Sequence, residues 1–263
     1  FVRTDWENLN GTWDFGFDDE NAGEKEKWYQ EFKGDKKINV PFTYETKLSG
    51  IQDETRHDFI WYHRTISVDG EKLENNRYIL HFEGSDFITK VWVNGAYAGS
   101  HRGGYARCSF DVTNLVHDGE NELTVKVEDS YDPQQPRGKQ RWIKENFGCW
   151  YIQTTGIWKT VWSEYVPKIG LASVKMTPDL QNAALKLEYE VDAAEEVLGE
   201  DLIVTASVSF KGVPVAKQSV MANQKHVRTT MNVSYYGSIG LEWGVCTWTP
   251  SRGHRILHSG TFV

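Results

Sequence analysis

Short stretches in which apolar and polar residues alternate run through the first two-thirds of the chain, each bounded by turn-forming residues. A period of two residues is typical of β-strands that bury one face. It predicts strands at residues 13–17, 58–66, 78–82, 88–93, 122–127 and 157–164. No segment sustains the 3.6-residue period of an amphipathic helix, so the pattern favours an all-β fold.

Turn residues lie between these strands. Asn94-Gly95 directly follows the strand at 88–93, and both residues tolerate the positive φ angles of a type I′ turn, so the pair predicts a tight hairpin into residues 96–99. Residues 118–121 predict another turn, and residues 114–116 a single helical turn.

A long stretch from Ser130 to about residue 148 interrupts the strand pattern and carries several Pro and Gly residues. Loops of this length are more often functional than connective. Strand character returns at 157–164 and ends before Pro167. We therefore place a domain boundary at Pro167.

The pattern changes after Pro167, where aromatic residues become sparse and the alternations shorter. Strands are predicted at 171–176, 184–191, 202–210 and 229–233. Strands at this spacing over about 95 residues are typical of a small immunoglobulin-like β-sandwich. The chain is therefore expected to hold two all-β domains.

The amino-acid composition agrees with a pair of β-sandwiches and excludes some classes of ligand. Aromatic residues make up 13% of the chain, with 11 Trp, against a hydrophobic fraction of only 39%, so the cores must rely on a few large rings. Exposed rings of this kind also stack on sugars, although packing is their commoner duty. The net charge of −8 argues against nucleic acid, and the absence of a run of about 18 apolar residues argues against a membrane span.

The sequence shows none of the common cofactor or metal motifs. The eight histidines have no HExxH spacing, and neither a GxSxG elbow nor a phosphate-binding GxxxxGK[ST] loop is present, so we expect no cofactor and no metal. Cys108, Cys149 and Cys246 are odd in number and form no CxxC pair, which favours free thiols and a reducing compartment. A signal peptide removed from the start would change that compartment.

Three groups of residues together resemble a known family. The first group is Val91-Trp92-Val93-Asn94-Gly95, Gly103-Gly104-Tyr105, Phe110-Asp111-Val112-Thr113 and Asn121-Glu122-Leu123-Thr124-Val125-Lys126-Val127. The second is Pro136-Arg137-Gly138-Lys139-Gln140 with Trp142, followed by Trp150-Tyr151, Thr154-Thr155-Gly156-Ile157-Trp158, Val161-Trp162 and Glu164. The third is Gly11-Thr12-Trp13-Asp14-Phe15 with Val40-Pro41. Together they resemble the sugar-binding domain of family 2 glycoside hydrolases.

The resemblance implies a jelly-roll, galactose-binding-like β-sandwich over residues 1–167 and an immunoglobulin-like β-sandwich over 168–263. It implies a parent enzyme that is a retaining exo-β-glycosidase, most similar to β-galactosidases. The catalytic (β/α)₈ barrel of that family, with its two glutamates, has no counterpart in this sequence, so no catalytic residue is expected. Asn121-Glu122 resembles the acid/base dipeptide of the barrel but lies in a predicted turn before a strand.

The same resemblance suggests which residues contact substrate. An acidic residue at the position of Asp129 reaches the sugar in related β-galactosidases, where it would accept hydrogen bonds from hydroxyl groups. Arg137, Lys139, Gln140 and Trp142 are candidate loop contacts, either to sugar or to the barrel. Thr43 replaces an asparagine that some β-galactosidases carry two residues after Val-Pro.

Two other functions stay open. The chain could be a free-standing carbohydrate-binding or adhesion module, or a scaffold whose loop only braces the barrel. The expected partners are a β-glycoside and the downstream barrel, with no nucleic acid and no membrane, and oligomerisation is left open. Trp248-Thr249-Pro250 resembles the start of the last strand of the second domain, but the residues after it depart from the family pattern.

Overall fold

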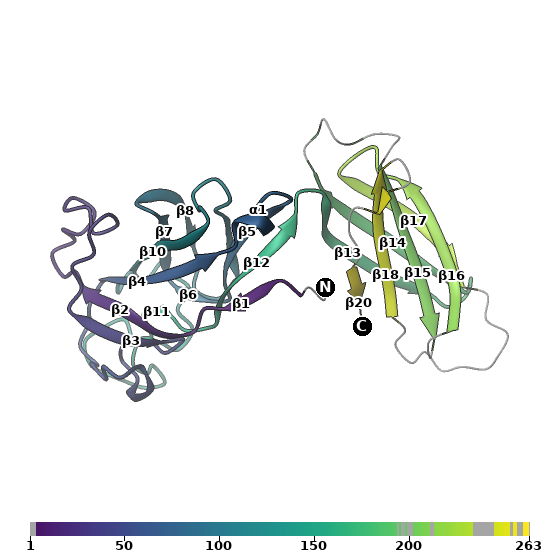
Figure 1. Ribbon diagram of the computed structural model, residues 1–263. Coiled ribbons are helices and arrows are strands. Elements are labelled where there is room, and N and C mark those ends of the chain that lie inside the picture. The colour runs from purple at the N-terminus through teal and green to yellow at the C-terminus, as the bar shows by residue number, and fades with distance from the viewer. Residues whose placement is uncertain are drawn as a thin grey trace. The chain divides into compact units, whose positions relative to one another are not determined.

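The structure, a computed structural model, describes residues 4–193, 195, 198, 202–210, 213–233, 245–252, 255–256 and 260–262 (Figure 1). The chain divides into two compact units, one of residues Asp5–Tyr165 and one that begins at Val166. Strands account for nearly all the regular structure described, which confirms the predicted all-β fold.

The first unit is built from two main sheets and a small third one. The larger sheet has the order β3 (Lys36–Val40), β2 (Gly11–Phe17), β4 (Phe59–Val68), β10 (Gly119–Glu128), β7 (Ile88–Val93), β8 (Ala96–Arg102). The second has the order β1 (Trp6–Asn8), β12 (Val161–Pro167), β5 (Asn76–Phe82), β9 (Cys108–Asp111). A two-stranded sheet pairs β11 (Gly156–Ile157) with β6 (Ser85–Asp86).

The core of this unit lies on one face of each large sheet, as the alternation predicts. Phe15, Tyr62 and Val125 from adjacent strands of the six-stranded sheet are fully buried and pack in one cluster with Leu80 and Phe82 of β5. The rings of Phe15 and Tyr62 meet edge to face at 5.1 Å. Each such side chain contributes about 1.5–3 kcal/mol by leaving water, so the cluster holds the two sheets together.

Most local predictions for this unit are confirmed. Asn94 and Gly95, both at positive φ, join β7 to β8 with Val93 opposite Ala96, as expected of the predicted hairpin. The strand predicted at 157–164 is confirmed at residues 161–164, which belong to β12, and is wrong as one continuous strand: residues 156–157 pair with β6, and β12 begins only at Val161. The chain turns between them because the backbone amides of Trp158 and Lys159 both donate to the Gly84 carbonyl. The turn predicted at 118–121 is also wrong, since β10 already begins at Gly119.

Helices are short. A 3₁₀ turn, η1, covers Lys47–Ser49, and α1 covers Gly70–Leu73, where the Asp69 carboxylate caps the amides of Glu71 and Lys72. Neither was predicted from the sequence. Within the described ranges, every helix is far too short to cross a lipid bilayer.

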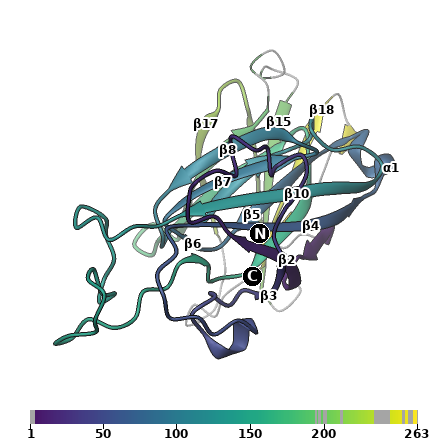
Figure 2. The ribbon, with the colours of Figure 1, turned by 90° about the vertical axis from the view of Figure 1, so that its left-hand side faces the viewer.

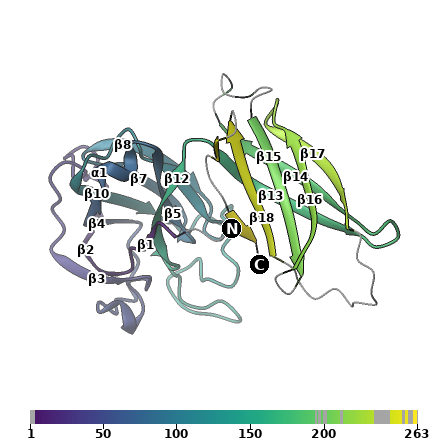
Figure 3. The same ribbon diagram turned by 45° about the vertical axis from the view of Figure 1, so that its right-hand side comes forward.

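The second unit is also a β-sandwich (Figure 3). One sheet has the order β13 (Gly170–Asp179), β14 (Ala184–Asp192), β17 (His226–Asn232). The other has β16 (Val213–Met221), β15 (Leu202–Phe210), β18 (Val245–Arg252) and β19 (Arg255–Ile256), with β20 (Gly260–Phe262) also paired to β18. The four strands predicted here are confirmed. Strand β16 was missed because its sequence, Val-Pro-Val-Ala-Lys-Gln-Ser-Val-Met, contains a proline and alternates poorly.

Trp248-Thr249-Pro250 lies within β18, which pairs with β15 over eight positions, from Val245 to Arg252. Residues 253–254, in the stretch expected to be atypical, lie outside the described residues. Cys108 is buried and Cys149 exposed, and both are free thiols, while the side chain of Cys246 lies outside the described residues.

Candidate functional site

The long loop of the first unit carries most of the predicted site residues. It runs from Ser130 to Thr155, longer than predicted, and is the teal segment that extends from the sandwich in Figure 2. Isolated bridges between Gln140 and Tyr151, and between Phe147 and Trp150, fold it back on itself. The two ends of the loop lie beside one another, since Thr155 at its end donates a hydrogen bond to Asp129, the residue just before its start.

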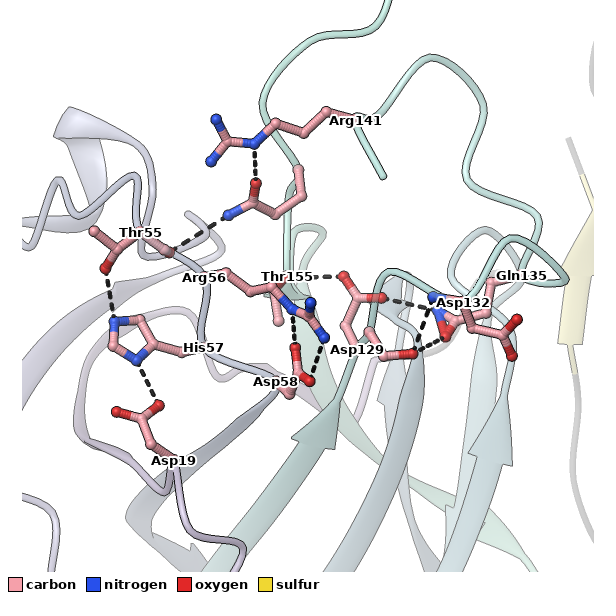
Figure 4. A network of polar contacts seen from close by, with 12 residues as sticks. Asp19, Thr55, Arg56, His57, Asp58, Asp129, Asp132, Gln135, Arg141 and Thr155 are labelled. Atoms are coloured by element: carbon pink, nitrogen blue, oxygen red, sulfur yellow. Dashed lines mark hydrogen bonds and ion pairs between the residues drawn. The ribbon is translucent and has the colours of Figure 1, made fainter. Parts of the chain in front are cut away.

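Asp129 stands where β10 ends and the loop begins (Figure 4). Its side chain is buried, with a relative exposure of 7%, and both carboxylate oxygens are held within the loop. Gln135 Nε2 donates to Oδ1 at 2.9 Å and Thr155 Oγ1 donates to Oδ2 at 2.9 Å. Each oxygen has a second lone pair, so this carboxylate is fixed in position and can still accept further hydrogen bonds.

Glu45 lies on the far side of Thr155. The Thr155 amide donates to Glu45 Oε1 at 3.0 Å, so one threonine binds both acids. Glu45 is 4% exposed, and its Oε2 is buried without a hydrogen-bond partner. Burial, with a smaller contribution from the Asp129 charge, raises the pKa of Glu45 to about 7. Burial also raises the pKa of Asp129, although hydrogen bonds from Thr155 and the charge of Arg137 oppose the rise.

A third buried acid, Asp86, is bonded to the middle of the loop. Gln140 Nε2 donates to Asp86 Oδ2 at 2.7 Å, and Gln140 Oε1 accepts from the Thr154 amide at 2.8 Å. Burial raises the pKa of Asp86 to about 6, and the Asp129 charge adds to the rise. We call Glu45, Asp86 and Asp129 the carboxyl cluster. The amide and hydroxyl of Thr155 link Glu45 to Asp129, and the Gln140 side chain links Asp86 to the Thr154 amide.

Two arginines brace the loop from within. Arg137 donates through Nη2 to the carbonyls of Ser130 at 2.8 Å and Asp132 at 2.6 Å. Arg141 is buried and donates through Nε to Gln153 Oε1 at 2.7 Å and through Nη2 to the Glu54 carbonyl at 2.6 Å. The loop is therefore ordered by its own side chains, and Arg137 donates its hydrogen bonds mainly to carbonyl groups of the loop.

Lys139 and Trp142, the remaining predicted contacts, lie on the outside of the loop. The Lys139 side chain is exposed, and its carbonyl accepts from the Tyr151 amide at 2.7 Å. Trp142 is 40% exposed and meets Phe147 edge to face at 6.0 Å, while Phe147 stacks on Trp150 at 4.8 Å. These rings form an apolar outer surface on the loop.

The return of the chain from the loop depends on one glycine. Gly156 has a φ of +97°, and a Cβ placed there would lie 2.1 Å from the hydroxyl oxygen of Tyr62. The same Tyr62 hydroxyl accepts from the Ile157 amide at 3.2 Å. Only glycine allows this close approach, which sets Thr155 between Glu45 and Asp129.

The structure thus brings together some predicted residues and separates others. Asp129 belongs to the carboxyl cluster and Gln140 donates a hydrogen bond to it. Arg137 braces the loop, and Lys139 and Trp142 face outward. Sequence reasoning missed Glu45 and Asp86, because an isolated acid beside an aromatic residue gives no sign of burial. Thr43, two residues before Glu45, is buried, and its Oγ1 has no hydrogen-bond partner.

The arrangement suits hydrogen bonding better than metal binding. No group of three or more His, Cys, Asp or Glu side chains within the described part of the chain could hold a metal ion. A fixed carboxylate in a buried polar setting can instead accept hydrogen bonds from hydroxyl groups. The fold and this site define a β-sandwich domain with a fixed, buried carboxylate at the root of its long loop.

The comparison with known families agrees with this class. The model described as glycosyl hydrolases family 2, sugar binding domain, matches residues 6–167, so the chain belongs to this family. The resemblance found in the sequence is thereby confirmed.

Known relatives carry names of two activities. A putative beta-glucuronidase of Formosa agariphila is 34% identical over 143 residues, covering 53% of this chain and 16% of that protein. A beta-galactosidase of Thermoanaerobacter pseudethanolicus is 26% identical and covers 80% of this chain and 27% of that protein. A solved β-glucuronidase of Ruminococcus gnavus, in complex with C6-substituted uronic isofagomine, superposes with a TM-score of 0.76 at 18% identity. The superposition covers all of this chain and 45% of the Ruminococcus gnavus chain. The chain therefore spans less than half the length of the proteins it resembles.

Proposed function

We propose that this chain is the non-catalytic, sugar-positioning region of a family 2 exo-β-glycosidase, with its sugar-binding domain in residues 1–167 and its immunoglobulin-like domain in 168–263. The observation that carries the proposal is Asp129, a buried carboxylate held on both oxygens at the root of an ordered loop. Such a group orients a sugar hydroxyl and takes no part in proton transfer.

The loop would have two faces with different duties. The carboxyl cluster lies at its root, where a sugar could be held, while Trp142 and its neighbouring rings on the outside would pack against a catalytic barrel. Arg137 and Arg141 would keep the two faces at a fixed separation, because both bind the loop backbone or its immediate neighbours.

The substrate we favour is a β-galactoside, because the sequence pattern of residues 136–164 is most similar to β-galactosidases. The second candidate is a β-glucuronide, which the name of the relative with 34% identity favours. A binding or adhesion module without a catalytic partner is the alternative of a different kind.

Assays of the full-length protein and of the 263-residue chain, side by side on aryl β-galactoside and aryl β-glucuronide, test these proposals. We expect turnover only by the full-length protein, with the galactoside preferred. Turnover by the 263-residue chain alone would contradict the non-catalytic role. A full-length protein inactive on both glycosides would support the binding module instead.

A further inference from the structure

A cavity opens on the face of the six-stranded sheet opposite the core, and none of its lining residues belongs to the carboxyl cluster. Asp14, His63, Thr124 and Trp92 lie opposite one another on β2, β4, β10 and β7. Their sequence neighbours Trp13, Phe15, Tyr62, Val125, Val91 and Val93 are buried in the core, so this row points outward. The cavity, of about 380 Å³, is lined by Asp14, His63 and Thr124 of this row.

The chain between β2 and β3 forms the opposite wall. This segment, residues 18–35, is the dark purple loop that crosses in front of β7 and β10 in Figure 2. The ring of Tyr29 stacks on Trp92 at 5.3 Å with 8° between planes, and Trp28 packs on Trp61 at 5.9 Å. The cavity is therefore bounded by the sheet on one side and by Trp28, Tyr29 and Phe32 on the other.

The wall is anchored by charged groups as well as by rings. Glu24 Oε1 accepts from Lys126 Nζ and Lys90 Nζ, each at 2.7 Å, and Lys126 is itself buried. Asp18 Oδ2 accepts from the indole Nε1 of Trp61 and from the Gly23 amide, both at 2.9 Å. Because these bonds fix residues 18–35 on the sheet, the cavity is formed before any ligand arrives, as in most small-molecule sites.

The lining combines flat rings with hydrogen-bonding groups. Phe32 stacks on His63 at 5.1 Å, and the nitrogens of His63 contact Glu122 Oε2 at 2.6 Å and Asp14 Oδ2 at 3.4 Å. Glu122 and Gln30 are exposed, so both can bond a visiting group. Glu122 belongs to the Asn-Glu dipeptide that resembled a catalytic pair in the sequence, and here it lines this cavity.

A pyranose fits this lining better than other ligand classes. Its C–H face stacks on aromatic rings, while its hydroxyl groups donate to carboxylates and accept from amides. A purely apolar ligand would cover the carboxylates of Asp14 and Glu122, which pair with Lys37 and His63, without adding a hydrogen bond to either acid. A uronic acid or phosphate would lie beside the carboxylates of Asp14 and Glu122, and Lys37, which pairs with Asp14, would balance only part of their repulsion. We propose that this cavity is a second carbohydrate site, specific for neutral hexopyranose units and independent of Asp129.

Titration of the 263-residue chain by calorimetry and tryptophan fluorescence, with lactose and cellobiose as neutral probes and glucuronic acid as the charged one, tests the proposal. We expect a neutral disaccharide to bind with a Kd on the order of 1 mM, and glucuronic acid at least roughly 10-fold more weakly. Equal or tighter binding of glucuronic acid, or no binding of either neutral disaccharide, would overturn the proposal.

Variants locate the binding. Glu122→Gln keeps the shape of the side chain and should weaken the neutral sugar roughly 10-fold, because it replaces a charged acceptor. Phe32→Leu removes the flat ring and should weaken binding several-fold, with the unfolding midpoint recorded to verify the fold. Glu190→Gln, the same exchange at an exposed acid of the second unit, is the matched control and should leave this binding unchanged. If Asp129→Ala abolishes binding while Glu122→Gln does nothing, the sugar sits at the loop, and the second site is refuted while the proposed function stands.

Discussion

The two units of this protein bury different kinds of side chain. The first buries seven Asp, Glu, Lys and Arg side chains, namely Asp18, Glu45, Asp86, Lys126, Asp129, Arg141 and Glu164. In the described part of the second unit no Asp, Glu, Lys, Arg or His side chain is buried, and Leu187, Val191, Val204 and Met231 lie in its core. Buried charges cost free energy unless they are paired or hydrogen-bonded, so a fold that carries many of them has a use for them. The difference agrees with the proposal that the first unit holds the sugar.

The largest effect should come from the glycine that closes the loop. Gly156→Ala introduces a Cβ within 2.1 Å of the Tyr62 hydroxyl at a φ of +97°, and we expect a loss of roughly 3–5 kcal/mol from strain and overpacking together. Gly119→Ala is the matched control, since its φ is +88° but its Cβ would meet nothing within 4 Å, and it should cost about 1 kcal/mol.

Denaturant unfolding followed by tryptophan fluorescence measures both variants, because nine of the 11 tryptophans lie in the first unit. Equal losses for the two glycines would show that the close approach to Tyr62 is not a constraint.

The buried acids should make the stability of the first unit depend on pH. The pKa of Glu45 is about 7 in the folded chain against an ordinary 4.5, so the folded state holds a proton that the unfolded state has released. The free energy of unfolding should therefore fall as the pH rises from 4.5 to 7. At about 1.4 kcal/mol per pH unit, the fall is about 3 kcal/mol. Asp86, with a pKa of about 6, acts in the same direction.

Glu45→Gln should remove the part of this pH dependence that Glu45 contributes, leaving the part due to Asp86, and should make the first unit more stable than the parent chain at pH 8. Glu190→Gln, an exposed acid of the second unit, serves as control. Unfolding midpoints measured from pH 4.5 to 8 decide the matter. A Glu45→Gln variant that keeps the slope of the parent chain would contradict the assigned burial.

The smallest effect should come from the surface charges of the second unit. Glu188 pairs with Lys175 at 2.7 Å and Arg228 at 3.0 Å, and these bonds lower its pKa. Both partners are largely exposed, and such pairs contribute little because water and salt screen them. Glu188→Gln should leave the thermal midpoint unchanged in 0.15 M salt. A clear drop would show that charge also holds the second unit together.

The sequence predicts the fold well because alternation reports burial on one face of a sheet. Residues 88–99 were predicted as strand, turn and strand, since Asn94-Gly95 permits few other conformations. Residues 157–164 were mispredicted because alternation continues through Trp158, while a long-range contact to the Gly84 carbonyl breaks the strand. Local pattern carries no information about such a contact.

The site was predicted only in part for the same reason. Asp129 and Gln140 lie in a loop whose length and composition are visible in the sequence. Glu45 and Asp86 come from positions 84 and 43 residues before Asp129, and only the fold brings them to Thr155 and Gln140. The cavity beside Glu122 was likewise hidden, since its walls are residues 18–35 and three strands, β2, β4 and β10, that are distant in sequence.

The kinetics of Asp129 variants in the full-length protein test the central proposal most directly. Asp129→Asn keeps the size of the side chain, Asp129→Ala removes it, and Asp132→Asn is a control in the same loop. The account predicts that kcat/KM on an aryl β-glycoside falls roughly 10- to 100-fold for Asp129→Ala and less for Asp129→Asn, with unfolding midpoints preserved. An Asp129→Ala enzyme as active as Asp132→Asn would contradict it.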